Sequence, residues 1–124
     1  MNSKLIQEYI ETAEGIHAME IQGSKAIRKW NKMQDRMRAI VVELASKGNE
    51  SIKEFLVVLD SESAVVSAAH HLVELAEIDS ETTNKCFKLV ELAMKKQENS
   101  GNVANALGEK MWLKEWKSKR GITG

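Results

Sequence analysis

The residues best suited to chemistry in this sequence are two adjacent histidines, His70 and His71, followed closely by Glu74 and Glu77. Imidazole and carboxylate groups can together bind a metal ion or transfer protons. Adjacent helical residues, however, point about 100° apart, so these two rings cannot converge on one ion. We therefore expect no metal site. We interpret the pair as helix-surface histidines flanked by carboxylates, with contact to a partner as the alternative.

Helical spacing also predicts where each of these side chains points. His71 is expected near solvent, together with Ser67 and Glu74, whereas His70 is expected to border the side of the helix that carries Val73. These positions would leave His71 and Glu74 accessible to a partner.

The remaining reactive residue is Cys86, which has no histidine close to it in sequence. We interpret it as a small apolar core residue. The sequence contains no glycine-rich phosphate loop, no serine elbow and no paired-cysteine motif. The sequence therefore predicts neither an enzyme nor a cofactor.

Localisation is predicted from the same kind of observation. The single cysteine cannot pair within the chain, and the N-terminal stretch MNSKLIQEYIE lacks the apolar run of a signal peptide. The longest uncharged apolar run, FLVVL, is too short to span a bilayer. These features indicate the reducing environment of the cytoplasm.

Charge is balanced overall but segregated along the chain. There are 18 basic and 18 acidic side chains, yet residues 49–81 carry eight carboxylates against the single Lys53. The flanking segments, 24–48 and 82–124, are basic. Such an acidic middle segment can pair with its flanks, or can present an acidic face that attracts a basic partner.

Nucleic-acid binding is the function that the basic flanks would suggest. Zero net charge and the interleaved Asp35, Glu109 and Glu115 weaken the attraction for phosphates, so we expect no direct nucleic-acid contact. The basic residues in question are Lys25, Arg28, Lys29, Lys32, Arg36, Arg38, Lys110, Lys114, Lys117, Lys119 and Arg120.

The elements that must position these groups are predicted to be helices. Apolar residues recur at helical spacing in 3–16, 24–47, 65–76, 86–94 and 103–116, and a short helix is expected within NESIKEFLVVLD, residues 49–60. No segment reads convincingly as a strand. We therefore predict an all-α single domain, 1–124, of about six helices, arranged as an array of helix hairpins or as an irregular bundle.

Local signals refine these boundaries. Ser3 is expected to cap the first helix, Gly48 to end the second, and Ser51 with Glu54 to form a capping box, with Asn49 as a rival cap.

Two tryptophans, Trp112 and Trp116, lie one turn apart in the last predicted helix. We expect at least one of them to close the core, with partner contact as the alternative.

A pentapeptide, LVELA, occurs at 72–76 and again at 89–93, and VVELA occurs at 41–45. On a helix, its first, fourth and fifth residues share one face and the glutamate points away. The pattern is either generic amphipathic sequence or a true repeat of helix hairpins. Both alternatives predict that Leu72, Leu75 and Ala76 pack inward, as do Leu89, Leu92 and Ala93, whereas Glu74 and Glu91 lie in water.

The run from Asp60 to Val73, DSESAVVSAAHHLV, resembles the second half of a HEAT repeat: an aspartate in the turn, a valine five residues later, a small alanine and a further aliphatic residue. It departs from that pattern because it lacks the usual turn proline and has Val66 where an arginine is usual.

A wider resemblance covers residues 22–121. The stretches KAIRKWNKMQDRMRAIVVELASKG, FLVVLDSESAVVSAAHHLVELA and LGEKMWLKEWKSKRG, with Trp30 and Asn31 opening the long helix, resemble an uncharacterised bacterial family of small HEAT-like helical proteins. The resemblance implies that the chain is an immunity protein of a contact-dependent or other polymorphic toxin system.

The expected function follows from this resemblance together with the acidic segment. A nuclease toxin needs a basic cleft, so an acidic inhibitor can occupy that cleft and associate quickly. We expect a monomer that binds and neutralises such a toxin; the alternative is a HEAT-like protein-binding adaptor unrelated to toxins. The candidate toxin-binding residues are Glu50, Glu54, Asp60, Glu62, Ser67, His70, His71, Glu74 and Glu77.

Overall fold

A computed structural model describes residues 2–19 and 23–121. Within these ranges the chain forms six α-helices and one 3-10 helix, with no strand, and the predicted all-α class is confirmed. The elements are α1 (Ser3–Ala18), α2 (Gly23–Lys47), α3 (Asn49–Phe55), η1 (Leu56–Asp60), α4 (Val65–Leu75), α5 (Ser80–Asn99) and α6 (Val103–Lys119).

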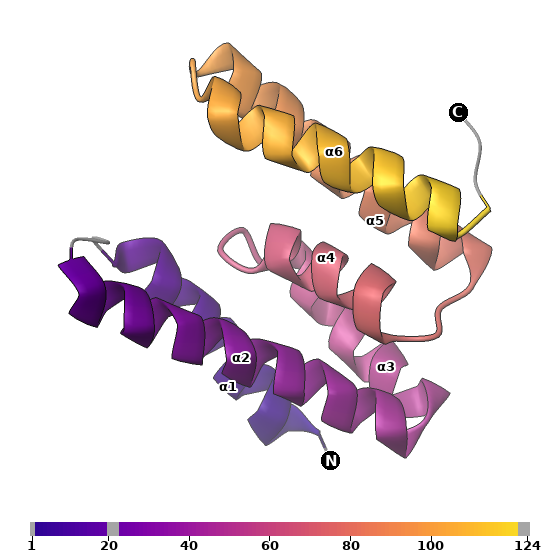
Figure 1. Cartoon of the computed structure of the whole chain (residues 1–124). Helices are drawn as coiled ribbons and strands as arrows, with labels where there is room; N and C mark the ends of the chain where they lie inside the picture. Colours follow the sequence, from indigo (N-terminus) through magenta and orange to yellow (C-terminus); the bar gives the residue numbers. More distant parts are fainter. Residues whose placement is uncertain (1, 20–22, 122–124) are drawn as a thin grey trace.

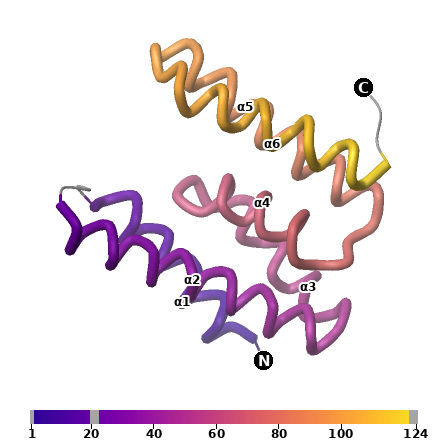
Figure 2. Tube along the Cα trace, in the orientation of Figure 1, coloured from indigo at the N-terminus to yellow at the C-terminus, as the bar shows by residue number. Residues whose placement is uncertain are grey.

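The helices pack as three successive hairpins (Figure 1). Helices α1 and α2 form the first layer, α3, η1 and α4 the middle layer, and α5 and α6 the last. Helix α4 contacts α2 on one side and α5 on the other, so it is the central helix of the stack. The three hairpin tips lie at the same end of the stack (Figure 2).

Helix lengths differ between the layers. The 11 residues of α4 lie between the 25 of α2 and the 20 of α5. At a rise of about 1.5 Å per residue, α4 is shorter than α5 by roughly 13 Å. The tip of the middle hairpin therefore ends short of the two outer tips (Figure 2).

One buried apolar cluster runs through all three layers. Its largest fully buried side chains include Tyr9, Phe55, Met37, Leu72 and Val90. Cys86 is also fully buried, and burial raises the pKa of its thiol to about 11, which confirms it as a core residue. The rings of Trp112 and Trp116 pack against the cluster from α6, as expected.

The predicted caps are wrong and one turn is confirmed. Ser3 is the first residue of α1, and Asn2 occupies the cap position. Ser51 lies inside α3, and the rival cap Asn49 is the first residue of that helix, with Gly48 at the cap position. The turn after α2 requires Gly48, whose φ of 113° is a backbone conformation that other residues rarely adopt.

The predicted capping-box residues hold the N-terminal segment instead of capping their own helix. The amide nitrogen of Asn2 donates to the Ser51 hydroxyl at 2.9 Å and to Glu54 Oε2 at 2.7 Å, and Lys47 Nζ donates to the Asn2 amide oxygen at 3.2 Å. Asn2 is 7% exposed, so this contact ties the start of α1 to α3.

Candidate functional site

The carboxylates of the acidic segment are divided between the two ends of the middle hairpin. Because α3 and α4 run in opposite directions, the start of α3 and the end of α4 lie at one end of the middle hairpin, whereas the turn after η1 lies at the other. Exposed Glu50, Glu54 and Glu77 occupy the first end, and exposed Asp60 and Glu62 the second. The candidate carboxylates therefore do not form one cluster.

At the first end, part of the charge is compensated. Glu50 pairs with Lys53 at 3.6 Å, and Glu54 accepts the hydrogen bond from Asn2. Lys53, Glu77 and Asp79 border a small depression of about 140 Å³ between α3 and the α4–α5 connection.

The expected solvent positions of Glu74 and His71 are also wrong. The Glu74 side chain is only 17% exposed, and His71 as a residue is 5% exposed. A central helix is covered on more than one side, so the face opposite its apolar stripe still meets neighbours. Ser67, also a candidate, is half-buried on α4.

Glu74 is the centre of a polar network between the layers. Arg38 of α2 donates to its Oε1 at 2.9 Å, and Trp112 of α6 donates from the indole nitrogen to its Oε2 at 2.8 Å. The Nδ1 of His70 lies 3.8 Å from the same Oε2, an ion-pair distance rather than a hydrogen bond. One carboxylate thus contacts groups from three layers.

His70 extends this network to a second carboxylate. Its Nε2 lies 3.0 Å from Glu109 Oε2, and its ring lies against the Trp112 indole with centroids 4.0 Å apart. Burial would lower the pKa of His70, but the hydrogen-bonding and charge effects of Glu109 and Glu74 outweigh burial and raise that pKa to about 9. His70 is therefore protonated at neutral pH and donates to Glu109.

The same contacts keep Glu74 ionised. His70 contributes most, followed by Arg38 and Trp112; together they overcome burial and lower the pKa of Glu74 to about 2. The network therefore joins two cations to carboxylates inside the stack, and its members are already engaged with one another.

His71 forms a separate buried contact on the side of α4 that faces α1. Its Nδ1 and the Tyr9 hydroxyl are hydrogen-bonded at 2.7 Å. Burial, reinforced by the positive charge of Arg38, lowers the pKa of His71 to about 4 and keeps the ring neutral. Burial also raises the pKa of Tyr9. His71 thus serves the packing of α1 against α4 and is not available to a partner.

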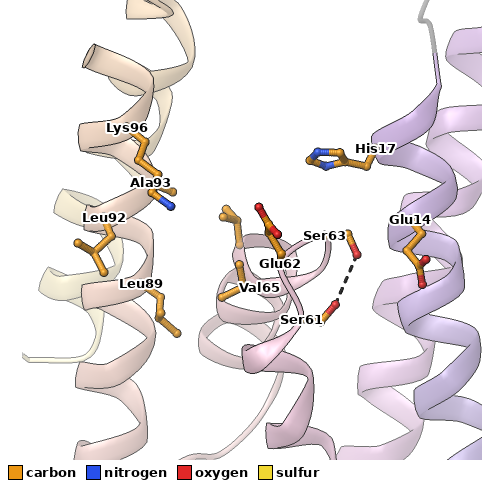
Figure 3. A pocket seen from close by; sticks show the side chains of 11 residues that line it. Glu14, His17, Ser61, Glu62, Ser63, Val65, Leu89, Leu92, Ala93 and Lys96 are labelled. Atoms are coloured by element: carbon orange, nitrogen blue, oxygen red, sulfur yellow. Dashed lines mark hydrogen bonds between the residues drawn. The ribbon is translucent and has the colours of Figure 1, made fainter. Parts of the chain in front are cut away.

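The second end of the middle hairpin opens into a groove of about 830 Å³. Its floor is the turn and first residues of α4, and its walls are α1 and α5 (Figure 3). The groove exists because the short middle hairpin leaves the two longer layers unfilled at their tips. The lining residues are Glu14, His17, Ser61, Glu62, Ser63, Val65, Val66, Leu89, Leu92, Ala93 and Lys96.

The two walls of the groove differ in character. The α1 wall is polar and carries Glu14 and His17, whereas the α5 wall is mainly apolar and presents Leu89 and Leu92, with Lys96 nearer the end of that helix (Figure 3). Leu92 is 56% exposed, contrary to the inward position that the pentapeptide predicts, because the described helices leave this face of α5 uncovered.

The charged groups of the groove are not paired with one another. Across residues 2–19 and 23–121, neither Glu14 nor Glu62 forms an ion pair with a basic side chain, and Lys96 forms none with an acidic one. Of the predicted site residues, only Glu62 lines this groove. The other residues that line the groove were not predicted. They come together only because the helices differ in length, and no local motif encodes that difference.

The described part of the chain contains no group of three or more histidine, cysteine or acidic side chains placed to hold a metal ion. None of its described helices has both the length and the apolar character needed to cross a membrane. Compared with protein-family models, curated proteins and solved structures, the chain gives no match.

Proposed function

We propose that this protein is a cytoplasmic immunity protein that binds and neutralises an antibacterial toxin, a nuclease, by covering the toxin's active site. The sequence resemblance described above supports this proposal. The structural observation that carries it is the groove, where unpaired carboxylates lie beside an apolar wall.

The charge of the groove fits a nuclease partner. A nuclease binds a polyanion, so its cleft must be basic. Glu14 and Glu62 form no ion pair with a basic side chain among the described residues, so both carboxylates are available to a second molecule. Opposite charges across an interface accelerate association, and this acceleration falls as salt is added.

The interior network argues against partner binding through Glu74 and His70. Glu74, His70 and Glu109 are engaged with one another and with Arg38, so they stabilise the stack and leave the surface groups to a partner.

The test is co-expression of this protein with the product of the adjacent upstream reading frame. We expect a stable complex on co-purification, loss of the toxin's nuclease activity in the complex, and survival of cells that express both proteins. A product of that reading frame that neither binds nor is neutralised would overturn the proposal.

A HEAT-like adaptor with another cytoplasmic partner is the second candidate. The exposed apolar Leu92 in a groove bordered by three layers favours protein binding in general. The two candidates differ in their genomic neighbourhood: a large secreted toxin encoded directly upstream supports the immunity role, whereas its absence supports the adaptor.

A further inference from the structure

We propose that the groove, and not the Glu50–Glu54–Glu77 end, is the toxin-binding site, and that it takes a toxin segment in which a lysine or arginine adjoins a large apolar residue. This inference rests on the proposed function, and it specifies which toxin side chains bind in the groove. It follows from the different charge and polarity of the two groove walls.

The apolar half of this recognition lies on α5. Leu89, Leu92 and Ala93 form this wall, and Val65 and Val66 continue it across the floor. An apolar side chain that covers Leu92 removes from water a leucine that the fold leaves 56% exposed. The surface is therefore suited to an aliphatic or aromatic side chain.

The charged half lies on the floor and the α1 wall. Glu62 projects from the turn before α4 and Glu14 from α1 (Figure 3). A cation beside Glu62 would supply the opposite charge that this carboxylate lacks among the described residues, and Glu14 adds negative charge on the α1 wall. Lys96, on the opposite wall, disfavours a cation there, so the basic side chain of the segment must point towards α1.

The alternative acidic end is less suitable for three reasons. Lys53 already pairs with Glu50, Asn2 occupies Glu54, and the depression beside Glu77 measures only about 140 Å³. The groove is about 830 Å³, within the range of roughly 300–1,000 Å³ that is usual for ligand pockets.

The first experiment measures affinity for the purified toxin with matched pairs of variants. Glu62→Lys and Leu92→Asp should each weaken binding about tenfold or more, because one reverses a facing charge and the other places a carboxylate on the apolar wall. The matched controls are Glu50→Lys, at the other end of the hairpin, and Leu107→Asp on α6, where the leucine is 55% exposed. Both controls should bind as the wild type does.

Helical circular dichroism should be unchanged for all four variants, since every substituted side chain is exposed. Wild-type affinity of both Glu62→Lys and Leu92→Asp would overturn the inference, and so would an equal loss in the two controls. In either case, binding by the wild type would leave the proposed immunity function standing.

A second experiment does not depend on the toxin. The peptide acetyl-Lys-Leu-Lys-amide is titrated into the ¹⁵N-labelled protein, with acetyl-Glu-Leu-Glu-amide as control. We expect amide shifts at Glu62, Leu92 and Ala93 with the basic peptide only. Shifts centred on Glu50 and Glu77, or equal shifts with both peptides, would overturn the inference. If the basic peptide shifts the groove amides but the toxin does not bind, the groove recognises a basic and apolar segment, and its partner is a protein other than the toxin.

Discussion

The polar network around Glu74 and the groove beside Glu62 use the same chemical groups in opposite ways. In the network, each carboxylate faces a cation or an N–H donor from another layer. In the groove, the carboxylates face solvent and an apolar wall. The acidic segment therefore divides into one part that joins the layers and another that lies at the surface without an ion pair among the described residues.

The largest effect should come from breaking the network at its centre. Glu74→Ala leaves Arg38 and the Trp112 indole without their acceptor and removes a negative charge beside His70. Because the Arg38 side chain is 43% exposed, we expect a cost of about 2–3 kcal/mol, that of hydrogen bonds to a charged group rather than of a fully buried ion pair. The urea midpoint of unfolding should fall accordingly. Glu62→Ala is the control on the groove side, and its expected change is within about 0.5 kcal/mol. Equal losses in the two variants would erase the distinction between the regions.

A smaller effect should follow from neutralising His70 at high pH. The pKa of His70 is about 9 in the folded protein and near the ordinary 6.5 when unfolded, so its contribution is complete below pH 6.5 and is lost as the pH rises towards 9. Urea unfolding at pH 7 and pH 9 should therefore show lower stability at pH 9. The loss should be smaller than that of Glu74→Ala, because Glu74 remains bonded to Arg38 and Trp112.

His70→Gln isolates this effect, since glutamine carries no titrating charge. We expect its stability to change less between pH 7 and pH 9 than that of the wild type. An equal change in both proteins would assign the alkaline loss to another group.

A still smaller effect is expected at the second interior contact. Tyr9→Phe keeps the ring but leaves the buried His71 without its hydroxyl partner, which should cost about 1–2 kcal/mol in the free energy of unfolding. Thr12→Val on the same helix is the control, because the one hydrogen bond that its hydroxyl makes among the described residues is to the Glu8 carbonyl of α1 itself. A Tyr9→Phe protein as stable as the wild type would show that this contact adds nothing to packing.

The smallest effect on stability is expected on the groove wall. Leu92→Ala should change the free energy of unfolding by less than about 0.5 kcal/mol, because the leucine is more than half exposed. Val90→Ala, two residues away and fully buried, should cost about 2 kcal/mol. Chemical denaturation gives the free energy of unfolding of both variants. The difference between them would show which face of α5 belongs to the core and which to the groove. A costly Leu92→Ala would make the groove wall part of the core.

The helices could be predicted from the sequence because their apolar spacing and turn signals are local. The repeated pentapeptide shows where this reasoning stops. In 41–45 the outward Glu43 and the inward Leu44 lie as predicted. In 72–76 the glutamate is drawn inside, and in 89–93 Leu92 is left outside, since the pattern defines the faces of a helix but not which faces neighbours cover.

The candidate site was predictable only in part for a related reason. Glu62 was predicted from the acidic segment, whereas Glu14 and Leu92 come from helices far away in sequence. These residues meet because α4 is short and its neighbours are long, and this difference becomes visible only when the hairpins are stacked.

Arg120 has a consequence for the order in which the chain is completed during synthesis. Its guanidinium donates to the carbonyls of Val73 and Ala76, at the end of the central helix, from a position 44 residues beyond Ala76. Until residue 120 has been synthesised, these carbonyls can bond only to water or to another donor. The end of the central helix therefore gains its Arg120 donor only after α5 and α6 have been made.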